Sequence, residues 1–211
     1  MLYTEEVLKN LNYSDCKDLK NSVYTEYLQY LISKFICNIK SVNPFYLFGS
    51  FYNRIRYGMN RLGNSLDFFS KRKTSKDYKI VNDILEQKLK LEGYEVTIAK
   101  ISKSKFEFII SSDKILNLET GKEIKFKIYI NYFSIVPFFK QSIFKGIVSS
   151  FHLNQYGINT KICSLLPELS LTILLRKIYL SGIIEPIELY DIFQLAIKLR
   201  QICEHNLFDK N

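Results

Sequence analysis

The sequence is poor in the residues that build several common kinds of site. It has no tryptophan, two histidines, and four cysteines that stand far apart without a Cys-x-x-Cys pair. Cysteines spaced in this way argue against a structural zinc site and are typical of reduced thiols in a cytoplasm. Neither His152 nor His205 neighbours a cysteine or a carboxylate cluster, which disfavours Ser-His-Asp and Cys-His mechanisms.

Long apolar runs are also missing. No stretch approaches the roughly 20 residues that a membrane span needs. The first ten residues, MLYTEEVLKN, are acidic and polar rather than signal-like. We therefore expect a cytoplasmic protein without membrane association. The 211 residues are 47% hydrophobic and 24% charged, which suits a chain that folds around a globular core.

Positive charge is in excess, with a formal net charge of +9. Eight basic residues lie between Arg54 and Lys79, against two acids, Asp67 and Asp77. This pattern favours a polyanionic partner such as a nucleic acid, a nucleotide or an acidic protein. The alternative is that a lysine-rich chain is basic without a specific partner. For each of these residues taken alone, the ordinary interpretation is a solvated position on a basic surface. The candidates for a nucleic-acid face are Arg54, Arg56, Lys71, Arg72 and Lys73.

Hydrophobic periodicity predicts an alternation of helices and strands. The expected fold class is α/β (α+β): a mixed sheet flanked by helices, with a C-terminal helical pair. We expect an α/β domain over residues 1–150 and a helical region over 151–211. The expected helices are 14–39, 50–58, 75–92, 166–182 and 186–202, and the expected strands are 45–49, 65–69, 94–101, 105–111 and 123–131.

Three of these elements carry patterns that bear on function. In helix 75–92 the inward residues are expected to be Ile80, Ile84, Leu85 and Leu89. In strand 65–69, Ser65 and Asp67 share one face. In strand 123–131 the polar face carries Lys125, Lys127, Tyr129 and Asn131.

The turn at Gly49-Ser50 comes between a buried strand and a helix. Such a turn offers free N–H groups and a hydroxyl to phosphates. Two carboxylates at i and i+2 on a strand lie on one face and can share metal ions. Here that pair of positions is occupied by Ser65 and Asp67.

The stretch LFGSFYNRIRYGMNRLGNSLDFFSK, residues 47–71, resembles the AbiEii/AbiGii toxin-like nucleotidyltransferases, within the polymerase-β-like nucleotidyltransferase superfamily. The family pattern is a Gly-Gly or Gly-Ser turn, fourteen residues, then Asp-x-Asp. Here Gly49-Ser50 is followed by fourteen residues and by Ser65-Leu66-Asp67, with Tyr57-Gly58 and Arg61 in register. A second match lies downstream, where Lys177 and the run Glu188-Leu189-Tyr190-Asp191 correspond to a helical lysine and an Asp-x-Tyr-Asp helix start.

The resemblance implies roles for these residues. Asp67 and Lys177 would be catalytic, and Asp67 would bind Mg²⁺. A nucleoside triphosphate (NTP) would be held by a set comprising Gly49, Ser50, Arg61, Ser65, Lys177 and Asp191.

Two departures set this chain apart from the family pattern. Ser65 replaces the first aspartate, and the strand expected to carry a third acid has Tyr129 and Asn131 instead. Glu107, on the neighbouring expected strand, is a minor candidate for a substitute acid. Because Mg²⁺ is usually held by one or two carboxylates plus substrate phosphates, the carboxylate count indicates impaired catalysis.

Two functional hypotheses follow. The first is a Mg²⁺-dependent transfer of a nucleotide from an NTP to an RNA or protein hydroxyl, as a toxin with an antitoxin partner. The second is a binding module on the same fold, which recognises a nucleotide, RNA or a protein. A scaffold role without any nucleotide is a third option. The sequence does not determine the oligomeric state.

Overall fold

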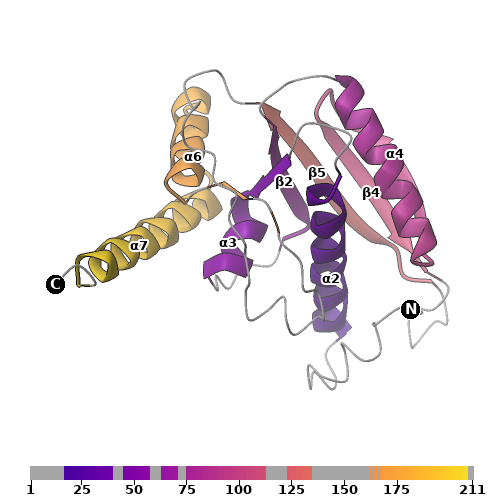
Figure 1. The fold of residues 1–211 in the computed structure, drawn as a ribbon, viewed down its shortest axis with the longest axis horizontal. Coiled ribbons are helices and arrows are strands. Elements are labelled where there is room, and N and C mark those ends of the chain that lie inside the picture. The colour runs from indigo at the N-terminus through magenta and orange to yellow at the C-terminus, as the bar shows by residue number, and fades with distance from the viewer. Residues whose placement is uncertain are drawn as a thin grey trace.

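In the computed structural model the described residues are 17–39, 45–57, 63–70, 75–112, 123–134, 162, 164–165 and 167–208. They form helices on both sides of a five-stranded mixed sheet (Figure 1). The helices are α2 (Lys17–Cys37), α3 (Gly49–Tyr57), α4 (Ser75–Leu91), α6 (Pro167–Ser181) and α7 (Pro186–Phe208). The strands are β1 (Phe45–Phe48), β2 (Ser65–Ser70), β3 (Glu95–Lys100), β4 (Lys105–Ser111) and β5 (Phe126–Ser134).

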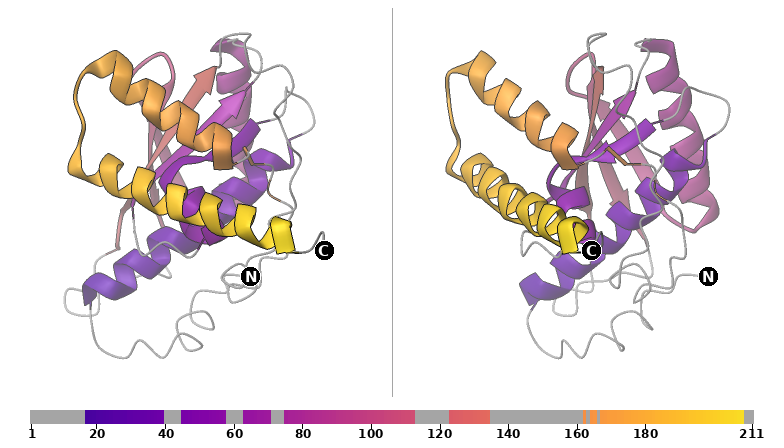
Figure 2. Two further views of the ribbon diagram at one scale, coloured as in Figure 1. Left: turned by 90° about the vertical axis from the view of Figure 1, so that its left-hand side faces the viewer. Right: turned by 60° about the vertical axis from the view of Figure 1, so that its left-hand side comes forward.

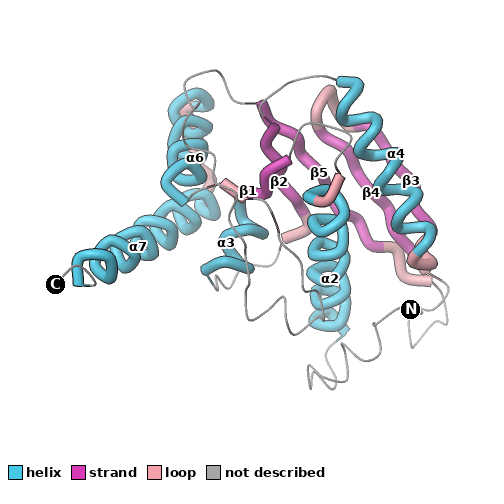
Figure 3. Tube along the Cα trace, in the orientation of Figure 1, coloured by secondary structure: helices cyan, strands magenta, loops and turns pink. Residues whose placement is uncertain are grey.

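The strands lie in the order β1-β2-β5-β4-β3, as the tube in Figure 3 shows. The pair β2–β5 is parallel and the other three pairs are antiparallel. This confirms the predicted fold class and the predicted order of helices and strands. The largest shift of a strand is at β5, which continues to Ser134 because its pairing with β2 extends to the partners Ser70 and Ser134. The division at residue 150 stays a prediction.

One face of the sheet is covered by α2 and α4. Leu66 and Phe68 of β2 point to this face and belong to the main hydrophobic core, together with Ile128 and Ile130 of β5. The strands alternate, so every second side chain of β2 and β5 enters the core and the others face away. Ser65 and Asp67 are therefore on the opposite face, as the sequence predicts.

Helix α4 contains one local correction. Leu85 and Leu89 are buried and Ile84 packs partly against the core, but Ile80 is 42% exposed, so its predicted inward position is wrong. Val81 is buried instead, because the buried positions along α4 are spaced three and four residues apart, as one helical face requires. The same face includes Tyr78, whose ring stacks on that of Tyr132 at 4.7 Å between centroids.

Helices α6 and α7 lie on the other side of the sheet from α2 and α4 (Figure 2). The contact is a small second core that joins Leu169 of α6 to Tyr46, Phe48 and Phe69. Leu165 N donates a hydrogen bond to the carbonyl of Leu47 over 3.1 Å, which fixes the chain entering α6 against β1. The helical pair therefore stands next to the edge of the sheet at which β1 meets α3.

Candidate functional site

The turn between β1 and α3 is built around Gly49. Its φ of 79° lies in the left-handed region that favours glycine. A Cβ added at Gly49 would lie 3.2 Å from Cγ and 3.3 Å from Cβ of Asp67, and closer still to Oδ2. The register explains this proximity, because Phe48 pairs with Asp67 across the antiparallel strands β1 and β2. The glycine lets the Asp67 carboxylate lie directly against the start of α3.

The Asp67 carboxylate also meets β5. Asp67 pairs with Asn131 in the parallel register, and Asn131 Nδ2 donates a hydrogen bond to Asp67 Oδ1 over 2.8 Å. Asn131 is the residue that occupies the polar face where the resemblance would place a third acid. A neutral amide therefore donates to the carboxylate here, and a second negative charge is absent from this position.

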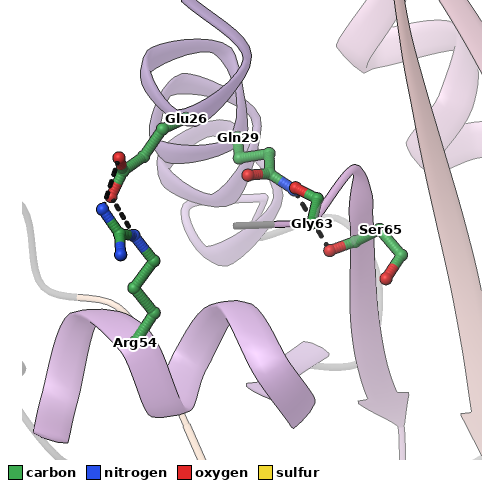
Figure 4. A network of polar contacts seen from close by, with 5 residues as sticks. All are labelled: Glu26, Gln29, Arg54, Gly63 and Ser65. Carbon is green, nitrogen blue, oxygen red and sulfur yellow. Dashed lines mark hydrogen bonds and ion pairs between the residues drawn. The ribbon is translucent and has the colours of Figure 1, made fainter. Parts of the chain in front are cut away.

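Ser65 lies one pleat before Asp67 on the same face and pairs with Tyr129. The chain leading into it is held by Gln29 of α2, whose Nε2 donates to the carbonyls of Gly63 at 2.9 Å and Ser65 at 3.2 Å. Figure 4 shows this amide reaching from α2 to the start of β2. Ser50 Oγ lies 3.9 Å from the position that a Cβ on Gly63 would take, so the two glycine-containing segments of the motif face each other.

The first turn of α3 contributes backbone groups to the same place. The first N–H groups of a helix have no partner within the helix and carry partial positive charge. Gly49 and Ser50 begin α3, and the Asp67 carboxylate lies against Gly49. A carboxylate beside a helix N-terminus is electrostatically stabilised. An aspartate with a purely structural role would gain the same stabilisation here.

Beyond Asn131 the polar face continues across β5 to β4. Tyr129 pairs with Glu107, and the hydrogen bond to Glu107 is the main reason that the pKa of the Tyr129 hydroxyl is raised above its ordinary value. Lys127 Nζ lies 3.7 Å from Glu107 Oε1, and Lys105 Nζ lies 5.0 Å from the centre of the Tyr129 ring. The face next to Asp67 therefore presents lysines and an aromatic ring.

The described residues do not build a two-metal centre. They contain no group of three histidine, cysteine or acidic side chains that could surround a metal ion. Glu107 faces the same side as Ser65 but is two strands away, a separation of about 10 Å, and it interacts with Tyr129 and Lys127. It does not stand in for a missing acid. Asp67 remains the described carboxylate at the turn, and it can contact a Mg²⁺ ion that arrives bound to a triphosphate.

The C-terminal motif lies on α6 and α7. Lys177 belongs to α6, but its side chain is outside the described part, so its predicted role in binding the nucleotide stays a prediction. Asp191 and Glu188 are buried on one face of α7, at 4% and 8% exposure. Glu188 Oε2 accepts a hydrogen bond from the N–H of Glu185 over 3.3 Å, which caps the start of α7. Buried acids on this helix need polar or cationic surroundings.

The basic candidates divide into three groups. Arg54 forms a two-pronged ion pair with Glu26, with Nε–Oε1 at 2.7 Å and Nη2–Oε2 at 3.0 Å. Figure 4 shows that this pair links α3 to α2. Its geometry gives Arg54 a structural role in joining the two helices. Arg56 is exposed. The positions outside the described residues are Arg61, Lys71, Arg72 and Lys73.

Sequence reasoning missed three contacts at this site. It placed Asn131 on the polar face but not in contact with Asp67, and it did not identify Gln29 or Glu26 as partners of the motif. All three contacts join residues at least 28 positions apart in the chain. The available signal in the sequence was a glutamate at position 26 and a glutamine at position 29 within an apolar stretch of helix. Polar residues that become buried there need partners.

Comparisons with known proteins found similar folds among solved structures. The sequence matches no family profile and no curated protein. Among solved structures, the nucleotidyltransferase toxin MenT4 from Mycobacterium tuberculosis matches over 84% of this chain and 59% of its own, with a TM-score of 0.56 and 10% identity. JHP933 from Helicobacter pylori matches over 73% of this chain and 56% of its own, with a TM-score of 0.45 and 16% identity. The chain thus spans less than two thirds of these proteins, and its fold is nucleotidyltransferase-like.

Proposed function

We propose that this protein binds a nucleoside triphosphate at the Gly49-Ser50 turn and transfers its nucleoside monophosphate to a hydroxyl of an acceptor. The new bond joins the acceptor oxygen to the α-phosphorus, the hydroxyl proton is lost, and pyrophosphate leaves. The observation that carries the proposal is the contact between the Asp67 carboxylate and Gly49. It brings an acid to a helix N-terminus whose second residue is Ser50. Similarity to a structure named as a nucleotidyltransferase toxin supports the same function.

Each residue has a defined task in this proposal. The N–H groups at the start of α3 and the Ser50 hydroxyl bind phosphate oxygens. Asp67 would hold the Mg²⁺ that accompanies the triphosphate. That ion would supply neutralisation of the phosphate charge. Lys177 adds positive charge from α6, and Asp191 orients it.

The acceptor would approach over β5 and β4. Lys105, Lys127 and Tyr129 lie on the face next to Asp67. Lysines beside an aromatic ring suit a nucleic-acid strand, because the lysines can bind phosphates and the ring can stack on bases. An RNA hydroxyl is therefore the acceptor we propose, with a protein hydroxyl as the alternative. A toxin that is inhibited by a separate antitoxin fits this activity.

A second function is favoured by one specific observation. Asp67 is flanked by Ser65 and Asn131, so the described strand positions next to it lack the additional charges that hold a metal pair. A protein with this site could bind the nucleotide and release it unchanged. Transfer activity, and not nucleotide binding, separates the two functions.

The test measures both. Binding of each of the four NTPs is titrated with and without Mg²⁺, and transfer of labelled nucleotide to RNA is followed in parallel. Asp67→Ala should lower labelling by on the order of 100-fold, whereas Asp83→Ala, which removes an exposed acid of α4, should leave it unchanged. Binding without labelling would support the second function. Labelling that appears only in Ser65→Asp would do the same, and absence of binding to any NTP would exclude both.

A further inference from the structure

The α6–α7 hairpin exposes an unusual amount of apolar surface. We call six of its side chains the hairpin patch: Leu175, Tyr179, Leu180, Ile183, Leu189 and Phe193. Leu175 and Tyr179 stand four residues apart on α6, as do Leu189 and Phe193 on α7, so each pair shares one helical face. Ile183 lies between the helices, and Figure 2 shows this connection on the side of the hairpin away from the sheet.

Helix α7 buries two acids beside the apolar Leu195 and leaves large apolar residues exposed. Its buried face carries Glu188 and Asp191, while Leu189 and Phe193 are 57% and 60% exposed. A surface helix normally turns apolar residues inward and charged residues to water. These two acids belong to the C-terminal motif and are buried in the protein. These apolar side chains are exposed to water, which is energetically unfavourable.

The size of the hairpin patch indicates what can cover it. Aromatic side chains offer about 150–250 Å² each, and with a value near the lower end for leucine and isoleucine the six expose a summed area on the order of 800 Å². The largest apolar patch of a typical monomer is about 300–600 Å². A stable interface buries about 800 Å² on each partner. Summed over the two helices and their connection, the exposed area of these six side chains is of the size that one side of a dimer interface requires.

Charges next to the hairpin patch fit a partner of identical sequence. Arg176 and Glu185 are both exposed. They carry opposite charges, and each is next in sequence to an apolar residue of the hairpin. In a two-fold interface the same surface is used twice, so each charge can meet its opposite on the other copy. A polar rim around an apolar centre is the usual anatomy of such an interface.

We propose that the hairpin patch is the interface of a symmetric homodimer. The α6–α7 hairpin of one copy binds the same hairpin of the second. The buried acids of α7 stay directed toward each protein's own site. This inference does not depend on the proposed nucleotide chemistry.

The test is the mass of the full chain in solution, measured by light scattering and sedimentation over a wide range of concentrations. We expect twice the chain mass of 24.9 kDa. Phe193→Glu and Leu189→Glu should each raise the dimer dissociation constant by about 30-fold or more. Ile101→Glu, which charges an exposed apolar residue outside the hairpin, should not. Because the substituted side chains are exposed, circular dichroism should show unchanged folding.

The possible outcomes are distinct. A dimer that dissociates in both hairpin variants and persists in Ile101→Glu supports the proposal. A monomer at every concentration overturns it, and is the result expected if a different protein covers the patch. A dimer insensitive to both hairpin substitutions, or open-ended association beyond the dimer, overturns it as well.

Discussion

Asn131 donates a 2.8 Å hydrogen bond from Nδ2 to Oδ1 of Asp67 across the parallel strands β5 and β2. A carboxylate and an amide thus share the position where the family resemblance would place two carboxylates. The amide fixes the orientation of the acid without adding charge. The Asp67 carboxylate is held between Asn131 and the glycine turn at the start of α3.

Changing Asn131→Asp should place two carboxylates side by side. Without divalent cations at neutral pH, we expect the free energy of unfolding to fall by about 1–3 kcal/mol, since a charged-group hydrogen bond is replaced by repulsion. Mg²⁺ should restore part of the loss by bridging the two acids. Urea unfolding with and without Mg²⁺ measures both effects. Asn38→Asp is the control for loss of an exposed amide hydrogen bond, since Asn38 Nδ2 donates to the carbonyl of Lys34 over 2.8 Å. Recovery in Mg²⁺ should be confined to Asn131→Asp, and equal behaviour of the two variants would contradict the assigned contact.

Gly49→Ala should be more destabilising than an alanine at another positive-φ glycine. Gly182, with φ 65°, has nothing within 4 Å of an added Cβ, so Gly182→Ala reports backbone strain alone, about 1 kcal/mol. At Gly49 the same strain is joined by the collision with Asp67, and we expect a total of about 2–4 kcal/mol. The difference between the two variants, measured by chemical unfolding, isolates the collision. Equal losses would mean that Asp67 moves away freely.

Removing the charge of Glu26 should strongly destabilise the contact between α2 and α3. Glu26→Gln removes the negative charge from the mostly buried ion pair with Arg54. We expect the free energy of unfolding to fall by about 2–4 kcal/mol. Glu86→Gln breaks the exposed pair with Lys90, four residues along α4, and should cost less than about 0.5 kcal/mol. Thermal and urea unfolding compare the two. A loss at Glu26 as small as that at Glu86 would show that the buried pair adds little.

Stability should fall in alkaline solution through Tyr132. Burial is the main cause that raises the pKa of its hydroxyl above the ordinary value of 10, and Tyr78 adds to it. Above pH 10 the unfolded chain releases this proton while the folded chain keeps it. The free energy of unfolding therefore declines as pH rises, by up to about 1.4 kcal/mol per pH unit for this group. Below pH 10 its contribution is constant.

Tyr132→Phe should make that alkaline decline shallower. At neutral pH it should lose about 1–3 kcal/mol, because the hydroxyl donates to Asn82 Oδ1 over 2.8 Å and the buried acceptor is left alone. Tyr179→Phe, at an exposed tyrosine of α6, should change neither quantity. Unfolding titrations from pH 7 to about 11 test the slope. An unchanged slope in Tyr132→Phe would place the alkaline loss at another group.

Local sequence patterns predicted most of the fold. The alternation in Ser65-Leu66-Asp67 placed serine and aspartate on one face, because strand side chains have a period of two. The glycine at position 49 marked a turn that needs a positive φ. The error at Ile80 arose where several apolar residues on α4 could each face the core, and only contact with α2 and the sheet selected Val81.

The sequence alone determined the types of element, their order, and which residues of each strand share a face, because these depend on neighbours along the chain. The tertiary structure decided which residues meet: Asn131 with Asp67, Glu26 with Arg54, and Gln29 with the start of β2. It also decided that Glu188 and Asp191 of α7 are buried while Leu189 and Phe193 are exposed. Strand register and helix packing are set by contacts between distant segments, so no local pattern specifies them.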